Sequence, residues 1–230
     1  WNALKNSAIY TLAVLVLQIP FALLIAISIQ RQCRRNDFFK TVYFIPAICS
    51  MSVISIIWSL LLNKDIGIVS YYLSFLGIHL VDWLNNPKWA MPAVVFISIW
   101  KNFGLTMIML LAGLNNIPKH YYEAAEIDGC GKIRLFTNVM LPLIKPALAT
   151  SAIFSFYWKW DDFMGSLLYL NAPENYTVSI ALKLFCDPTS VSDYGAMFAM
   201  CVVSLLPVMV VFLFTQKYIV DGIAMSGLKA

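Results

Sequence analysis

Five long apolar stretches constrain the fold of this chain more than any other feature of its sequence. A helix needs about 20 apolar residues to cross the hydrocarbon core of a bilayer. Inside lipid every backbone N–H and C=O must be paired within the protein, so we interpret each stretch as a helix. The sequence therefore predicts an all-α membrane protein, a polytopic helical bundle with a single transmembrane domain over residues 1–230. The predicted spans cover about residues 7–30, 41–63, 90–114, 146–170 and 194–217.

The composition agrees with a lipid environment and excludes several classes of function. Charged residues make up 12% of the chain, against roughly 25% in soluble domains. The five cysteines form no CxxC pair, and no GxxxxGK[ST] or HExxH motif is present. We therefore predict a non-catalytic subunit with no cofactor, no metal and no nucleic-acid partner. The prolines inside the predicted spans indicate kinks or helix starts: Pro20, Pro46, Pro92 and Pro207.

The distribution of Lys and Arg predicts the orientation, because cytoplasmic loops carry an excess of these residues. One set of loops holds ten of them and the opposite set holds four, so we place the larger set and the C-terminus in the cytoplasm. The N-terminal end then faces outward, and we expect that the chain is truncated and that a sixth span precedes it. The larger set is Arg31, Arg34, Arg35, Lys40, Lys119, Lys132, Arg134, Lys145, Lys217 and Lys229; the smaller is Lys5, Lys64, Lys88 and Lys183.

Two loops are predicted to lie outside. Residues 64–89 contain the run GIVSYYLSFLGIHL, which is too short to span and is typical of a segment that lies along the membrane interface. Residues 171–193 are acidic and rich in turn residues, which fits either a contact for an external partner or a solvated connection. The residues behind this interpretation are Pro173, Glu174, Asp187, Pro188 and Asp193.

The cytoplasmic loop at residues 115–145 has the pattern of two short helices joined by glycine. Asn115 or Asn116 can cap a helix that begins at Pro118 and continues through residues 119–127. Gly129 can end this helix because it tolerates positive φ. A second helix is predicted near residues 132–139, ending before Leu141 and Pro142.

This loop resembles that of the permease subunits of binding-protein-dependent ABC importers. That family carries E-A-A, three residues, G, nine residues, an aliphatic residue, one more residue and then L-P. The chain matches at every spacing, with Val139 where isoleucine is commoner. The matching residues are Glu123, Ala124, Ala125, Gly129, Val139, Leu141 and Pro142.

The resemblance implies an ATPase-docking role for this loop. The helix around Glu123 would sit in a groove of a separate ATPase subunit, where Glu123 meets a basic residue and Gly129 permits the turn. ATP would be bound by that partner. The implied partners are homodimeric or heterodimeric ATPase subunits, a second permease subunit, an extracytoplasmic solute-binding protein and membrane lipid, in a bacterial plasma (inner) membrane. The expected docking residues are Glu123, Ala124, Ala125, Asp128, Gly129, Leu141 and Pro142.

Further segments resemble the maltose-type sugar permeases, and they leave the subunit type open. WNALKNS, FFKTVYFIP and PAVVFISIWK resemble one member of that permease pair, whereas IFSFYWKWDDF, YTVSIAL and QKYIVDGIAMSGLK resemble the other. We therefore expect an importer that moves a sugar or oligosaccharide by alternating access. The alternatives are a non-sugar solute (polyamine, amino acid, metal chelate or oxyanion) and an ion-coupled secondary transporter, which would not explain the loop.

Charged residues inside the spans indicate a functional or paired site. Lys101 is expected to approach Asp161 or Asp162, with Lys159 as the competitor at i+3. Polar residues also recur at helical spacing on the fourth span, which fits either a sugar path or a subunit interface. The stripe consists of Ser151, Ser155, Trp158, Lys159, Asp162, Ser166 and Tyr169.

Overall fold

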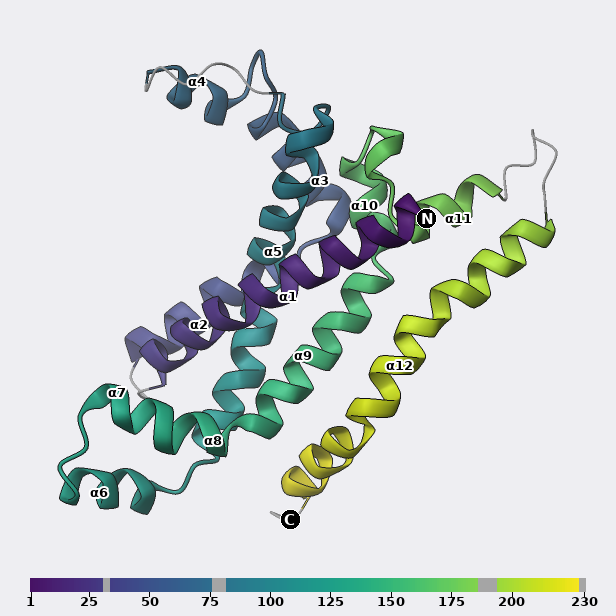
Figure 1. The fold of residues 1–230 in the computed structure, drawn as a ribbon. Helices are drawn as coiled ribbons and strands as arrows, with labels where there is room; N and C mark the ends of the chain where they lie inside the picture. Colours follow the sequence, from purple (N-terminus) through teal and green to yellow (C-terminus); the bar gives the residue numbers. More distant parts are fainter. Residues whose placement is uncertain (31–33, 76–81, 186–193, 228–230) are drawn as a thin grey trace. The chain divides into compact units, whose positions relative to one another are not determined.

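A computed structural model describes residues 1–30, 34–75, 82–185 and 194–227 of the chain. Over these ranges the backbone forms helices and turns without a β-strand, in agreement with the predicted all-α class (Figure 1). The longer elements are α1 (Asn2–Ile29), α2 (Arg34–Ile48), α3 (Met51–Leu61), α5 (Pro87–Asn115), α9 (Lys145–Trp160) and α12 (Tyr194–Gly227). The shorter ones are α4 (Ile68–Phe75), α6 (Lys119–Ile127), α7 (Lys132–Leu135), η1 (Phe136–Met140), α8 (Leu141–Leu143), α10 (Phe163–Tyr169), η2 (Pro173–Asn175) and α11 (Val178–Phe185).

Some residues used in the topology and loop predictions lie outside the described residues. They are Arg31, Asp187, Pro188, Asp193 and Lys229, and two of the five cysteines, Cys33 and Cys186, also lie outside. Among the cysteines that the structure describes, Cys49, Cys130 and Cys201 are free thiols.

Three of the predicted spans are single helices long and apolar enough to cross a membrane. They are α1, α5 and α12, each of which contains a proline without ending there. The prolines are Pro20, Pro92 and Pro207. The last helix continues to Gly227, ten residues beyond its predicted end.

The second predicted span is wrong in detail because it consists of two helices. The pair α2 and α3 passes the same test of length and hydropathy only when taken together, and the two axes differ by 95°. The break falls at Cys49 and Ser50, three to four residues after Pro46, and Ser50 has the extended ψ of 137° that precedes a new helix. Pro46 lacks the N–H that would bond the Val42 carbonyl, so it weakens the turn before it, whereas the break lies about one turn after it.

The fourth predicted span is also not one helix. Its helix α9 ends at Trp160, and α10 begins at Phe163 after Asp161 and Asp162. Aspartate competes for backbone N–H groups and is favoured at helix N-caps rather than in helix interiors. Asp162 has this role, because its side chain accepts a hydrogen bond from Gly165 N. The membrane-length bent pair here joins the helical run Lys132–Leu143 to α9, with a bend of 67°.

The chain divides into two compact units, which we describe separately. Unit 1 comprises Trp1–Val14, Ile48–Lys101 and Phe156–Val210. Its apolar core includes Tyr10, Ile54, Ile97 and Tyr169, which come from α1, α3, α5 and α10. In this unit the described part of the second predicted outer loop, residues 171–185, contains η2 and α11, and Val178 and Ile180 of α11 are buried.

Unit 2 comprises Leu15–Ala47, Asn102–Ser155 and Val211–Ala230. Its core gathers Ala22 and Ala26 of α1, Met107 and Leu110 of α5, and Ile144. Two glycines of α5 allow close helix contacts, because a Cβ at Gly104 would collide with the Tyr43 carbonyl oxygen and one at Gly113 with the Ala147 side chain. That the whole chain is one domain stays a prediction.

Candidate functional site

The predicted docking loop forms part of unit 2, and its first helix starts later than expected. Helix α5 continues to Asn115, so neither Asn115 nor Asn116 caps α6. Pro118 is instead the N-cap itself, with an extended ψ of 141°, and α6 begins at Lys119. The fixed φ of proline suits a position directly before or at a helix start.

Gly129 ends α6 in the predicted way. Its φ is +68°, the positive value that glycine adopts without a Cβ penalty. Gly129 N donates to the carbonyl of Glu126 at 3.0 Å, and Cys130 N donates to the carbonyl of Ala125 at 2.9 Å. These two bonds are the pair of a Schellman motif, which satisfies the last carbonyls of a helix. The glycine therefore fixes the direction in which the chain leaves α6.

The second helix of the loop is predicted to end before Leu141 and Pro142, and this prediction is wrong. Helical structure continues from α7 through the π-helix η1 into α8, which ends at Leu143. Pro142 lacks an N–H and its ring would crowd the carbonyl four residues earlier in a regular α-helix. A π-turn directly before the proline widens the backbone at this point, which accounts for the uninterrupted run.

The predicted docking residues differ in how accessible they are. Ala125 is 6% exposed, and α6 packs against η1. The neighbouring Ala124 is exposed, so only one of the two alanines is accessible to a partner. Leu141 is half-buried. The exposed members of the set are Glu123, Ala124, Asp128, Gly129 and Pro142.

Two isoleucines that the sequence analysis did not select are prominent on this loop. Ile127 at the end of α6 is 87% exposed, and Ile133 in α7 is 81% exposed. The sequence signal that could have identified them is that each is an apolar residue in a predicted cytoplasmic loop. The loop is also tied to the unit's interior, because Gln30 Nε2 donates to Tyr122 Oη at 3.2 Å and to the Leu114 carbonyl at 3.3 Å.

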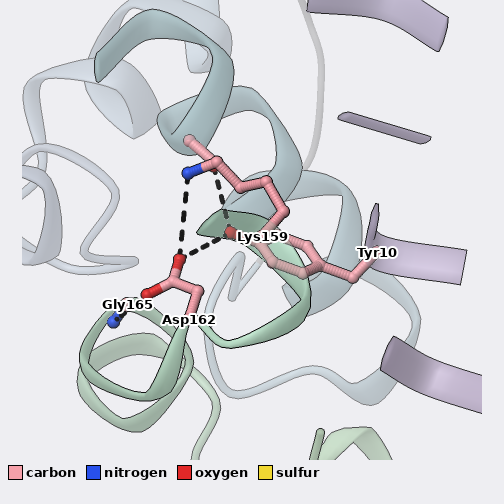
Figure 2. A network of polar contacts seen from close by, with 5 residues as sticks. Tyr10, Lys159, Asp162 and Gly165 are labelled. Atoms are coloured by element: carbon pink, nitrogen blue, oxygen red, sulfur yellow. Dashed lines mark hydrogen bonds and ion pairs between the residues drawn. The ribbon is translucent and has the colours of Figure 1, made fainter. Parts of the chain in front are cut away.

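A second candidate site, in unit 1, is a polar network centred on Asp162 (Figure 2). The Tyr10 hydroxyl donates to Asp162 Oδ2 at 2.9 Å and lies 3.0 Å from Ser98 Oγ. Lys159 Nζ lies 3.9 Å from the same Oδ2, and Gly165 N donates to Oδ1 at 2.9 Å. One carboxylate thus contacts groups from α1, α9 and α10, while Ser98 adds a contact from α5.

The lysines predicted inside the spans have different partners. Lys159 is 7% exposed and forms an i+3 ion pair with Asp162. This is the pair that was predicted to compete with a Lys101–Asp162 contact. Lys101 Nζ donates to the Cys49 carbonyl at 2.9 Å, at the break between α2 and α3. The predicted approach of Lys101 to Asp161 or Asp162 stays a prediction.

The polar stripe of the fourth span is interrupted by the break at residues 161–162. Ser151 and Ser155 on α9 and Tyr169 on α10 are buried, whereas Trp158 is 48% exposed and Asp161 is exposed. The Ser151, Ser166 and Tyr169 hydroxyls are buried and have no hydrogen-bond partner within the described part of the chain. The sequence analysis missed Tyr10 and Ser98, because only the packing of α1 and α5 brings them to Asp162.

Among the residues that the structure describes, no group of three His, Cys, Asp or Glu side chains could hold a metal ion. The two sites offer different chemistry: an exposed helical loop suited to a protein contact, and a largely buried network of hydroxyl, carboxylate and ammonium groups.

Membrane-length helices together with these two sites define the chain as a polytopic helical membrane protein. Residues 18–224 match the family described as "Binding-protein-dependent transport system inner membrane component". The chain belongs to this family, and it is a multi-pass membrane protein.

Curated relatives support the same family. The chain is 31% identical over 223 residues to the arabinooligosaccharides transport system permease protein AraP of Bacillus subtilis (strain 168), which covers 94% of this chain and 71% of the relative. It is 34% identical over 150 residues to the probable ABC transporter permease protein YesP of the same organism. That match covers 64% of this chain and about half (48%) of the relative's length.

The fold is similar to that of a solved transporter chain. A chain in the crystal structure of a bacterial ABC transporter involved in the import of the acidic polysaccharide alginate superposes with a TM-score of 0.83. The identity is 23%, and the match covers 94% of this chain and 77% of that one. At this identity the likeness concerns the fold.

Proposed function

We propose that this chain is a non-catalytic permease subunit of an ATP-driven importer that moves a sugar or oligosaccharide across the bacterial plasma membrane by alternating access. The observation that carries the proposal is the helix–glycine–helix loop from α6 to α8. It presents Glu123 on an exposed helix whose end is fixed by the Schellman turn at Gly129. An exposed, rigidly connected helix suits a protein contact that must transmit motion.

The partner at this loop is a separate ATPase subunit, in a homodimer or heterodimer. Glu123 pairs with a basic residue of the ATPase, and Ile127 and Ile133 supply apolar contact area around that charge pair. Closure of the ATPase dimer then moves α6, and the helical run to Leu143 passes that motion to α9. A second permease subunit and an extracytoplasmic solute-binding protein complete the importer.

The orientation places the α6–α8 loop and the C-terminus in the cytoplasm. The Lys and Arg excess in residues 31–40, 115–145 and the C-terminal segment supports this topology. The loops that contain α4 and α11 then face outward, on the side from which a solute-binding protein delivers its cargo.

The cargo is assigned to the carbohydrates on two grounds. The names of relatives such as AraP and a xylose/arabinose import permease of Haloferax volcanii specify sugars. Hydroxyl groups need hydrogen-bond donors and acceptors along their path, and Asp162, Tyr10 and the buried Tyr169 hydroxyl offer both within the membrane. The importer family also includes carriers of other solutes, so the sugar assignment is separate from the coupling role.

The coupling role is tested by Glu123→Lys. Because Glu123 is exposed, the variant is expected to fold and insert normally. Like charges in the ATPase groove are expected to weaken association by roughly 2 kcal/mol or more, about 30-fold. The measurement is titration of the ATPase subunit of the same importer against the permease in nanodiscs.

The charge-matched control is Glu174→Lys, which makes the same change at an exposed position of the opposite, outer loop. ATPase affinity of this variant is expected to equal that of the unmodified chain. Equal affinity of Glu123→Lys and Glu174→Lys would remove the docking role of α6.

A further inference from the structure

A polar pocket of about 240 Å³ lies in unit 1, apart from the Asp162 network and the α6–α8 loop. It is formed where the end of α3 and the turn after it meet the segment before α5 and Asn171, the second residue after α10. In the proposed topology this pocket opens on the outer face, where cargo arrives. Its polar lining comes from Ser59, Asn63, Lys64, Asp65, Asp82, Asn85 and Asn171.

Several of these side chains are oriented by bonds within the protein. Asn63 Oδ1 accepts from the backbone N–H groups of Asp65 at 2.8 Å and Ile66 at 3.1 Å, so its Nδ2 remains as a donor. Asn171 Nδ2 donates to Asn85 Oδ1 at 3.0 Å, so the Asn171 oxygen remains as an acceptor. Asn85 in turn is held by the Asp82 carboxylate at 3.0 and 3.1 Å.

The remaining polar atoms are available to a ligand. Within the described part of the chain, the Asp65 carboxylate, Asn63 Nδ2 and Asn171 Oδ1 have no hydrogen-bond partner. The Ser59 hydroxyl likewise has no hydrogen-bond partner among the described residues, and it can both donate and accept. The pocket thus presents donors and acceptors side by side on a partly prearranged wall.

This mixture selects among classes of ligand. A metal cation uses acceptor oxygens alone and gains nothing from the Asn63 amide donor. An anion is attracted by Lys64 but repelled by both Asp65 and Asp82, which leave the lining with a net negative charge. A neutral polyol carries hydroxyls that both donate and accept, so it can pair with both kinds of group. The volume is below the roughly 300–1,000 Å³ of pockets for drug-sized ligands, which fits one sugar ring rather than an oligosaccharide.

We propose that this pocket is an entry subsite that binds one ring of a neutral sugar before the sugar reaches the membrane-embedded path. The proposal rests on the proposed import of carbohydrate and adds the ligand class and the residues that contact it. Asp65 accepts hydrogen bonds from two adjacent hydroxyls, Asn63 donates to a ring or hydroxyl oxygen, and Asn171 accepts from a third hydroxyl.

The test is saturation-transfer NMR on the full chain in nanodiscs, without ATPase or binding protein, with maltotriose and xylotriose as probes. Both probes are neutral, and trigalacturonic acid and Tb³⁺ serve as the acidic and cationic comparisons. At least one neutral probe is expected to receive saturation, and Asp65→Ala is expected to weaken its binding about tenfold through the lost hydrogen bonds. Because the Asp65 carboxylate has no partner in the described chain, this change leaves the fold intact.

Asp37→Ala is the matched control, because it removes an exposed carboxylate whose ion pair with Lys40 lies at the surface. Its sugar binding is expected to equal that of the unmodified chain. The proposal is overturned if no neutral probe binds, if Asp65→Ala binds as well as Asp37→Ala, or if trigalacturonic acid or Tb³⁺ is preferred. It is equally overturned if Asp65→Ala spares sugar binding and weakens capture of the solute-binding protein, since the pocket is then a protein contact.

Failure of the subsite and failure of the importer assignment give different results. Glu123→Lys is expected to bind the neutral sugar normally, because the pocket does not involve the α6–α8 loop. Loss of ATPase docking in Glu123→Lys combined with no sugar binding in any variant would keep the importer and discard the subsite.

Discussion

Gly129 and Gly131 stand two positions apart in the loop after α6, and their backbone angles differ in sign. Gly129 has φ +68°, whereas Gly131 has φ −66° and serves as the N-cap of α7. A Cβ at either position would meet nothing within 4 Å, so any difference between them comes from the backbone alone.

This pair gives a prediction for the turn. Gly129→Val forces a β-branched residue into the left-handed region, at a cost of roughly 1–2 kcal/mol. Gly131→Val adopts an extended conformation without strain. We expect Gly129→Val to lower the thermal unfolding midpoint and weaken ATPase association, and Gly131→Val to change neither. Equal midpoints and equal association for the two variants would show that the turn geometry is not required.

Asp162 has two roles: it pairs with Lys159 and it caps the N-terminus of α10. Its spacing from Lys159 predicts the i+3 ion pair, which the structure contains at 3.9 Å. That spacing assumes a continuous helix, yet Asp162 caps α10 after a break. Because Lys159 belongs to the last turn of α9, the two side chains still meet across the break.

At the scale of elements, charged groups coincide with interruptions of membrane helices. The Lys101 ammonium donates to the Cys49 carbonyl where α2 gives way to α3, and Asp162 accepts from Gly165 N where α10 begins. A helix end leaves carbonyl or N–H groups without helical partners, and in lipid such groups are costly. The charged side chains therefore stabilise the breaks that the backbone makes.

The break at Cys49 gives an element-scale prediction. Lys101→Met removes the donor to the Cys49 carbonyl and should destabilise the α2–α3 joint by roughly 1.5–3 kcal/mol, as for a hydrogen bond to a charged group. The measurement is thermal unfolding in detergent. Lys88→Met, at an exposed position in the first turn of α5, is the control and should leave the midpoint unchanged. A Lys101→Met protein as stable as the control would mean that the joint is held by packing.

At the scale of the whole molecule, the proposed orientation is open to a direct test. A single cysteine at Lys132, in a background without the native cysteines, should react with an impermeant maleimide only from the cytoplasmic side. Asn175 is the natural outer counterpart by sequence, but it is 9% exposed and donates to the Pro87 carbonyl at 2.8 Å. The exposed neighbour Glu174 is the better reporter and should react only from outside. The reverse labelling pattern would contradict the orientation inferred from Lys and Arg.

Hydropathy and spacing alone determined the all-α membrane class, three of the five spans and the α6 turn. These properties are local: a long apolar run needs helical hydrogen bonding in lipid, and Gly129 is the residue that tolerates positive φ. The E-A-A loop pattern is local as well, and it led to the correct family.

Only the tertiary structure decided where the helices break and which polar groups meet. Pro46 indicated a kink in the second span, but hydropathy does not register a change of direction between two apolar segments, so the position of the break at Cys49–Ser50 and its 95° bend came only from the structure. Tyr10 and Asp162 are separated by 152 positions, and their hydrogen bond depends on how α1 packs in unit 1. Ala125 looks like part of an accessible surface by composition, yet its contact with the chain's own interior buries it. Such pairings follow from packing between distant segments, which no local pattern encodes.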